Sequence, residues 1–291
     1  MILCYAAGVV RKPSIAMVGA GNLGSALGVK LRRAGYRIAV VVGRPQSLKA
    51  RTLAKQVRSK TRSGLSDIDA DVIWICVPDS EISRAAKALA PKFGWRGKVA
   101  LHSSGALTSD ALDVLRKKGA SVASVHPLMT FVAGSQPSIR GVPFAIEGDA
   151  AAVRAARRMV SDLGGEAHTI RKQDKAAYHA WGTFASPLLT ALLATTERVA
   201  ELAGVKREAA RRRMMPILLQ TLVNYASYGA ADGFSGPIVR GDVQTIEKHL
   251  QVLRREPLTR KAYAALGLAA LQYLPAKNKA ELKKLLGASI H

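Results

Sequence analysis

Apolar residues near the start of the chain follow a strand pattern, then a helix pattern, then a strand pattern again. Ile15–Val18 form one short continuous apolar run and Ile38–Val42 form another. Between these runs, Leu23, Leu27 and Leu31 recur at the spacing of one helix face. This order predicts a βαβ unit of about 30 residues, the building block of a parallel sheet.

The same alternation continues to about residue 170 and then stops. Further strands are expected at residues 71–77, 98–101, 121–125, 143–147 and 167–170, and helices at residues 48–57, 80–90, 109–118 and 150–163. Later helices are expected at residues 174–203, 206–229, 242–254, 257–267 and from Asn278 onward. Pro187 should kink or break the first of these. We therefore predict an α/β fold, with a doubly wound parallel sheet in residues 1–170 and an all-α domain in residues 171–291.

Three glycines follow the first predicted strand and open the first helix. Gly19 permits the sharp turn, Gly21 lets the backbone approach a ligand, and Gly24 lets the helix pack close to the strand. The free amides of the first helical turn, including those of Asn22 and Leu23, are suited to bind phosphate. The pattern predicts a Rossmann-like dinucleotide site, and an ordinary glycine-rich turn is the alternative.

The residues after the second strand indicate which dinucleotide binds. An NAD site usually has an acidic residue there, but this chain has Gly43 and Arg44, followed by Ser47. A guanidinium matches the geometry of a phosphate, and a serine hydroxyl adds a donor. These residues favour NADP(H), although Arg44 is open to a second interpretation as an ordinary surface arginine.

Charge and cysteine content limit the other classes of function. The formal net charge of the 291 residues is +24, but the basic residues are dispersed over predicted helices without a nucleic-acid-binding motif. The densest cluster, Arg211–Arg213, is interpreted as a solvated helix face, so we expect no nucleic-acid partner. Cys4 and Cys76 form neither a disulfide framework nor a metal-ligand pattern, and Cys76 lies in an apolar run typical of a core. With neither a signal peptide nor a membrane span expected, the prediction is a cytoplasmic protein without a metal.

Candidate site residues stand at the ends of three later apolar runs. Val77 and Pro78 end one strand, His102, Ser103 and Ser104 follow the next, and His126 follows a third. Because the carboxyl ends of parallel strands open on the ligand crevice, Val77 and Pro78 are expected to touch the nicotinamide half of the cofactor. A histidine and a hydroxyl beside a nicotinamide suit hydride transfer with proton exchange. The alternative is that His102 and His126 bond only to backbone.

A loop at residues 229–242 separates two of the later helices. It contains Gly236-Pro237 and ends in Arg240-Gly241-Asp242, which predicts a tight turn with Asp242 as the N-cap of the next helix. Arg240 is a candidate to bind a substrate carboxylate, and pairing with a nearby carboxylate such as Asp242 is the plainer alternative.

These motifs, together with Lys175-Ala-Ala-Tyr178-His179, resemble a bacterial family over residues 13–285. In that family a Rossmann-like domain, often labelled deazaflavin-dependent NADP oxidoreductase-like, precedes a helical domain of unknown function. The resemblance implies wider relatives among pyrroline-carboxylate reductases, β-hydroxyacid dehydrogenases and prephenate dehydrogenases. It also implies a C-terminal domain of the 6-phosphogluconate-dehydrogenase-like type, through which such proteins commonly form homodimers.

The resemblance also implies roles for single residues. His126-Pro127 resembles the catalytic histidine-proline of prephenate dehydrogenases, and Ser103-Ser104-Gly105 resembles the substrate-holding loop of the hydroxyacid enzymes. Lys175 stands where the latter keep a catalytic lysine. Pro187 stands where the family usually has an asparagine, so this chain lacks an amide that orients substrate.

Together these patterns predict an NADP(H)-dependent oxidoreductase acting on a small carbonyl or imine compound in the cleft between the two domains. The predicted catalytic residues are His126, Ser104, Lys175 and His179, and His102, Tyr178 and Arg240 are predicted to bind substrate. A non-catalytic NADP-binding sensor or scaffold is the alternative.

Overall fold

The computed structural model describes residues 11–65, 68–92 and 94–290, so Cys4 lies outside the described residues. The chain divides into two compact units, one ending at Ser186 and the other beginning at Pro187. The last strand ends at Thr169, and every later element is helical. The helix that follows this strand therefore packs with the first unit, although the secondary structure changes near residue 170.

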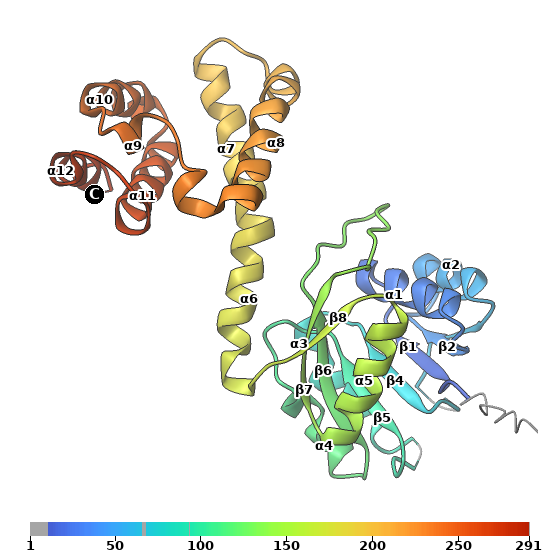
Figure 1. The fold of residues 1–291 in the computed structure, drawn as a ribbon. Coiled ribbons are helices and arrows are strands. Elements are labelled where there is room, and N and C mark those ends of the chain that lie inside the picture. Colours follow the sequence, from blue (N-terminus) through green and yellow to red (C-terminus); the bar gives the residue numbers. More distant parts are fainter. Residues whose placement is uncertain (1–10, 66–67, 93, 291) are drawn as a thin grey trace, which may run out of the picture. The chain divides into compact units, whose positions relative to one another are not determined.

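An eight-stranded sheet forms the centre of the first unit (Figure 1). Its spatial order is β3-β2-β1-β4-β5-β6-β7-β8. The strands are β1 (Ile15–Val18), β2 (Ile38–Val42), β3 (Lys60–Arg62), β4 (Val72–Ile75), β5 (Val99–His102), β6 (Ser121–Pro127), β7 (Pro143–Gly148) and β8 (Glu166–Thr169). The strand order reverses between β1 and β4, and in such sheets the ligand crevice opens at this switch point.

The predicted sheet is confirmed, with three differences of detail. β7 runs antiparallel to β6, because the two strands are joined by a loop without the crossover helix that a parallel return needs. The edge strand β3 was not predicted, since Lys60, Thr61 and Arg62 are all exposed and show no apolar alternation. Strand β6 also extends beyond its predicted end at Val125, so His126 and Pro127 lie within the ladder.

Helices cover both faces of the sheet and bury alternate strand residues in two cores. Ile15 and Met17 belong to one core, whereas Ala16 and Val18 belong to the other. The helices and helical turns of the first unit are α1 (Asn22–Arg33), α2 (Leu48–Gln56), α3 (Asp79–Leu89), η1 (Ser109–Leu112), α4 (Asp113–Arg116), α5 (Ala150–Asp162), η2 (Lys172–Asp174) and α6 (Lys175–Thr183). Cys76 packs against the first core, as predicted, and burial raises the pKa of its thiol to about 12.

Pro187 lies in a π-helical segment, Phe184–Leu188, between α6 and α7. A proline has no N–H for the helical ladder, and the wider π turn accommodates it without ending the helical run.

The second unit contains only helices among its described residues. They are α7 (Leu189–Leu202), α8 (Arg207–Asp232), α9 (Pro237–Arg240), α10 (Val243–Val252), η4 (Leu253–Arg255), α11 (Pro257–Tyr273) and α12 (Lys279–Gly287). The short helix α9 falls in the predicted loop, and Asp242 caps α10 as predicted by accepting from the Thr245 amide at 3.1 Å. Within the described ranges, no helix has the length and apolar character to cross a membrane.

Candidate functional site

The glycine turn after β1 has the geometry that its sequence predicted. Gly19 has φ of +104°, and a Cβ there would lie 2.5 Å from the Cys76 carbonyl oxygen. A Cβ on Gly24 would lie 2.2 Å from the Gly19 oxygen. A Cβ on Gly21, in contrast, would meet no atom of the described chain within 4 Å. Two of the glycines are therefore needed for packing, whereas Gly21 leaves space beside the start of α1.

A cleft of about 610 Å³ opens at the switch point of the sheet. Its lining includes seven of the eleven predicted cofactor residues: Gly19, Gly21, Gly43, Arg44, Ser47, Val77 and Pro78. The Arg44 side chain is exposed and forms no hydrogen bond or ion pair with any other described residue. Glu81 also lines the cleft, and its carboxylate pairs with Arg84. The cleft therefore combines the uncapped N-terminus of α1 at Gly21 with a guanidinium that pairs with no other described residue.

Three of the predicted cofactor residues have contacts within the protein. Ser47 caps α2 by accepting from the Ala50 amide at 3.2 Å, which leaves its hydroxyl hydrogen available to donate. Gly43 is needed for packing, since a Cβ there would lie 2.5 Å from the Ala50 Cβ. The side-chain amide of Asn22 donates to the Phe131 carbonyl at 3.1 Å and so holds the loop around Phe131 beside the glycine turn.

The loop after β5 is braced by its own polar groups. The buried Ser104 hydroxyl donates to Asp79 at 2.6 Å and accepts from the amides of Ala106 (3.2 Å) and Leu107 (2.8 Å). The Ser103 hydroxyl accepts from the Trp74 indole N–H at 2.8 Å. Both serine hydroxyls thus stabilise the loop in this structure.

His102 is fully buried, and both its ring nitrogens bond to backbone. Nε2 donates to the Thr108 carbonyl at 3.0 Å, and Nδ1 accepts from the Ser104 amide at 3.2 Å. Burial lowers the pKa of His102 to about 4, so the ring is neutral. His102 therefore holds the loop in this structure, as the alternative interpretation expected, and its role as a substrate ligand stays a prediction.

His126 is half-buried and differs from His102 in one respect. Its Nδ1 bonds to the Ser103 carbonyl at 3.1 Å, whereas Nε2 faces the position where a Gly105 side chain would begin, 2.9 Å from a Cβ built there. Burial and the nearby charges of Lys175 and His179 hold the pKa of His126 below its ordinary value. The neutral ring therefore carries its proton on Nδ1 and has its lone pair on Nε2.

Helix α6 brings three more predicted residues to this edge of the sheet. Lys175 is buried and bonds to the Ser104 carbonyl and the Ser124 hydroxyl. The His179 ring lies 5.7 Å from His126, and the Tyr178 ring lies 6.4 Å from it, both edge-on. The structure thus groups His126, Lys175, Tyr178 and His179, whereas Arg240 belongs to the second unit and its role stays a prediction.

Three polar residues of this site were not predicted from the sequence. Asp79 accepts from Ser104, Ser124 bonds to Lys175, and Glu147 accepts from the Ser109 amide (2.6 Å) and hydroxyl (2.8 Å). A signal existed for Ser124, since this polar residue stands between apolar neighbours in its strand, and for Glu147, which directly follows a run of apolar residues.

The strand order and the glycine turn define the first unit as a Rossmann-like domain. A family model described as a Rossmann-like domain matches residues 6–127, and one described as a domain of unknown function (DUF2520) matches residues 142–270. The chain therefore carries a Rossmann-like domain followed by a DUF2520 domain, which confirms the predicted family resemblance.

Solved structures share this fold over nearly the whole chain. A protein from Bacteroides fragilis assigned as an NADP oxidoreductase is 20% identical, with a TM-score of 0.74, and covers 89% of this chain and 97% of its own. An imine reductase from a Pseudomonas species is 21% identical, with a TM-score of 0.64 and coverage of 95% and 100%. An imine reductase from Myxococcus stipitatus in complex with NADP⁺ is 18% identical, with a TM-score of 0.65 and coverage of 94% and 100%. These identities establish the fold alone, and no curated protein sequence matches this one.

Proposed function

We propose that this protein is an NADP(H)-dependent oxidoreductase that transfers a hydride between nicotinamide and a small carbonyl or imine substrate. The observation that carries this proposal is the cleft at the switch point, where the open face of Gly21 and the Arg44 side chain, which pairs with no other described residue, lie in one cavity. The NADP oxidoreductase and the imine reductases that share the fold support the same reaction class. We place the activity in the cytoplasm, where a free thiol such as Cys76 persists.

The residues of the cleft fit NADP(H). The space beside Gly21 allows a pyrophosphate to approach the amides of Asn22 and Leu23 at the positive end of the α1 dipole. Arg44 and the Ser47 hydroxyl offer donors for a 2′-phosphate. Residues 11–65 contain many Lys and Arg residues and no Asp or Glu, so no carboxylate of this segment repels the phosphate.

NADP(H), when bound, supplies or accepts the hydride. The chain's own contribution is proton exchange at Nε2 of His126, which has its lone pair there because Nδ1 is bonded to Ser103. The neutral ring accepts a proton from a substrate hydroxyl or amine during oxidation, and the imidazolium returns it during reduction. Tyr178 and His179 flank the ring and offer surfaces for the substrate.

Replacing Arg44 with alanine should remove the preference for NADPH. Losing a charge-assisted bond to phosphate costs about 1.5–3 kcal/mol, which is roughly 10- to 150-fold in the dissociation constant. NADH binding should change less than about twofold, because NADH has no 2′-phosphate. Titration calorimetry with both nucleotides measures this.

Arg51→Ala is the matched control, because Arg51 is an exposed arginine of α2 outside the cleft lining. It should leave both affinities unchanged. Tighter binding of NADH than of NADPH by the wild type, with no effect of Arg44→Ala, would remove the case for NADP(H).

One observation favours the alternative of a nucleotide-binding protein without turnover. Ser104 and Lys175, two of the predicted catalytic groups, already have their polar atoms bonded within the protein. A wild-type protein that binds NADPH but oxidises it with no member of a broad panel of carbonyls and imines would support this alternative.

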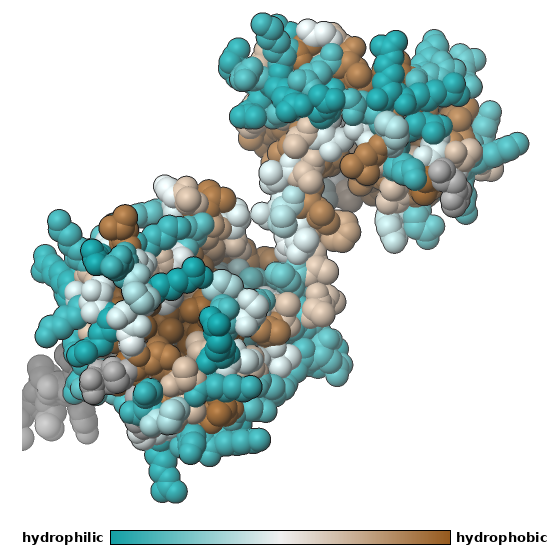
Figure 2. All heavy atoms as spheres, turned by 180° about the vertical axis from the view of Figure 1, so that it is seen from behind, coloured by the Kyte–Doolittle hydropathy of each residue, from teal (hydrophilic) through white to brown (hydrophobic). Residues whose placement is uncertain are grey.

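We also propose that the protein is a homodimer formed through the second unit. Helix α7 buries none of its residues and α8 buries only Ala210 in the described chain. On α8, Ile217, Leu222 and Tyr228 are 68%, 57% and 66% exposed. Apolar residues are visible on the surface of this unit in Figure 2. A patch of this kind marks a protein interface.

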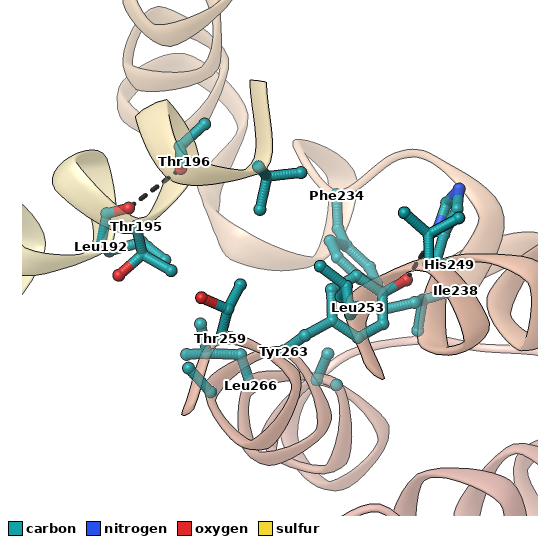
Figure 3. Close-up of a pocket in the computed structure, with 15 residues that line it drawn as sticks. Leu192, Thr195, Thr196, Phe234, Ile238, His249, Leu253, Thr259, Tyr263 and Leu266 are labelled. Atoms are coloured by element: carbon teal, nitrogen blue, oxygen red, sulfur yellow. Dashed lines mark hydrogen bonds between the residues drawn. The ribbon is translucent and has the colours of Figure 1, made fainter. Parts of the chain in front are cut away.

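An apolar pocket of about 580 Å³ in the same unit extends this surface. In Figure 3, Leu192, Thr195 and Thr196 of α7 face Thr259 and Leu266 of α11 across it. The pocket contains few polar groups, so it suits apolar side chains of a second copy better than a polar metabolite.

Leu222→Glu should convert the dimer to a monomer, because it would place a charge at the centre of the apolar α8 surface. Size-exclusion chromatography with light scattering should show the mass fall from twice the chain mass to the chain mass. Val132→Glu, which adds the same charge at an exposed apolar position of the first unit, is the control. A wild-type protein with the mass of one chain would contradict the dimer.

A further inference from the structure

Lys175 is the most deeply buried charged side chain of the site, with 1% of its surface exposed. Its ammonium donates to the Ser104 carbonyl at 3.1 Å and to the Ser124 hydroxyl at 2.7 Å. The Ser124 hydroxyl in turn donates to the same Ser104 carbonyl at 3.2 Å. Both lone pairs of that carbonyl are thus taken by one lysine and its serine partner.

The peptide unit just before this carbonyl lies between two histidines. Its N–H, on Ser104, donates to Nδ1 of His102 at 3.2 Å, and its C=O, on Ser103, accepts from Nδ1 of His126 at 3.1 Å. Since Ser104 is held on its carbonyl side by Lys175 and Ser124, the Ser103–Ser104 peptide has a fixed direction. That direction determines which nitrogen of His126 carries the proton.

We propose that Lys175 is a positioning residue, which locks the Ser103–Ser104 peptide so that His126 keeps its proton on Nδ1 and presents Nε2 to the substrate. This inference rests on the proposed function of His126 in proton exchange. It gives Lys175 a role different from the direct catalytic one that the family resemblance implies, because its ammonium is bonded inside the protein and has no surface for a substrate.

Electrostatics supports the same role. The charged and titratable groups around His126 are Lys175, Tyr178 and His179 from α6, Asp79 from α3 and His102 from β5. The positive charge of Lys175 disfavours the imidazolium, so it helps to keep the pKa of His126 low. Burial lowers the pKa of Lys175 itself, and the carboxylates of Glu147 and Asp79 partly offset that penalty.

The test is NMR of the full-length protein labelled with ¹⁵N-histidine, with the His126 signals assigned by their loss in His126→Asn. In the wild type, Nδ1 of His126 should be the protonated nitrogen. Lys175→Met keeps the length of the side chain and removes its charge and donors. It should give a mixture of His126 tautomers and a higher pKa of His126, while Kd for NADPH changes less than about twofold.

Two further variants separate positioning from general structural damage. Ser124→Ala removes only the hydroxyl bridge and should shift the tautomer mixture in the same direction by a smaller amount, which tests the proposal even if Lys175→Met does not fold. Lys172→Met is the control, since Lys172 is exposed, precedes the same helix and pairs with Asp110. Lys172→Met should leave the tautomer and the pKa of His126 unchanged.

Activity provides the second readout. Against a panel of cyclic imines and carbonyls, Lys175→Met should lower kcat about tenfold or more, a part of the 10²- to 10⁴-fold that proton transfer contributes. Loss of turnover in Lys175→Met with an unchanged His126 tautomer and pKa would overturn the proposal and make Lys175 a catalytic residue. If the wild type shows no turnover, the proposed reaction fails, whereas the tautomer measurement still decides the role of Lys175.

Discussion

Replacing Gly24 with alanine is expected to lower the free energy of unfolding by about 2 kcal/mol and to abolish nucleotide binding. The new Cβ would lie 2.2 Å from the Gly19 carbonyl oxygen and 3.0 Å from the Cys76 Cβ. Overpacking of this kind costs typically 1–3 kcal/mol or more, whereas the better helix propensity of alanine returns only about 1 kcal/mol. Because the clash is with the backbone of Gly19, helix α1 must move away from the glycine turn that precedes it. Urea denaturation measures the stability, and calorimetry measures NADPH binding.

Gly21→Ala is the matched control within the same turn. Its Cβ would meet no described atom within 4 Å, so the free energy of unfolding should change by less than about 0.5 kcal/mol. NADPH should nevertheless bind at least about tenfold more weakly, because the methyl group would occupy the space proposed for the pyrophosphate. A Gly24→Ala protein as stable as the wild type would show that the turn relaxes freely, and unchanged NADPH binding by Gly21→Ala would place the nucleotide elsewhere.

The order of the first strand, helix and second strand could be predicted because its determinants are local. Ile15–Val18 and Ile38–Val42 are continuous apolar runs, and Gly19 and Gly24 have separate steric requirements within six residues. The edge strand β3 could not be predicted in this way. Lys60, Thr61 and Arg62 have no apolar pattern, and they form a strand only because β2 offers them a parallel ladder.

The interior of the candidate site shows a second limit of prediction from the sequence. His126, Ser104 and Lys175 were singled out by residue type and by resemblance, and the structure does bring them together. Their hydrogen-bond partners depend on the fold, since Lys175 is 71 residues from Ser104 and Asp79 is 25 residues from it. The sequence pattern therefore indicated which groups gather at the sheet edge. It did not indicate that the Ser104 hydroxyl already makes three hydrogen bonds within the protein.

Replacing His126 with asparagine is expected to lower the rate of hydride transfer by 10²- to 10⁴-fold, the usual contribution of a general acid or base. The asparagine amide can still donate to the Ser103 carbonyl, so the loop after β5 should keep its conformation while the proton-exchanging nitrogen is lost. Affinity for NADPH should change less than about twofold. Steady-state and single-turnover measurements of NADPH oxidation test this. His168→Asn is the control, because His168 lies on β8 with 59% of its side chain exposed.

The pH dependence tests the same residue independently of folding. Reduction of a carbonyl needs the imidazolium of His126, whose fraction falls as pH rises through its pKa. Burial and the charges of Lys175 and His179 hold that pKa below the ordinary value of about 6.5. The reduction rate of the wild type should therefore fall as pH rises, with a midpoint below about pH 6.5, and the oxidation rate should rise over the same range. His126→Asn should flatten both profiles, and a variant that kept the wild-type rates and profiles would assign the proton transfer to another group, with His179 as the nearest candidate on α6.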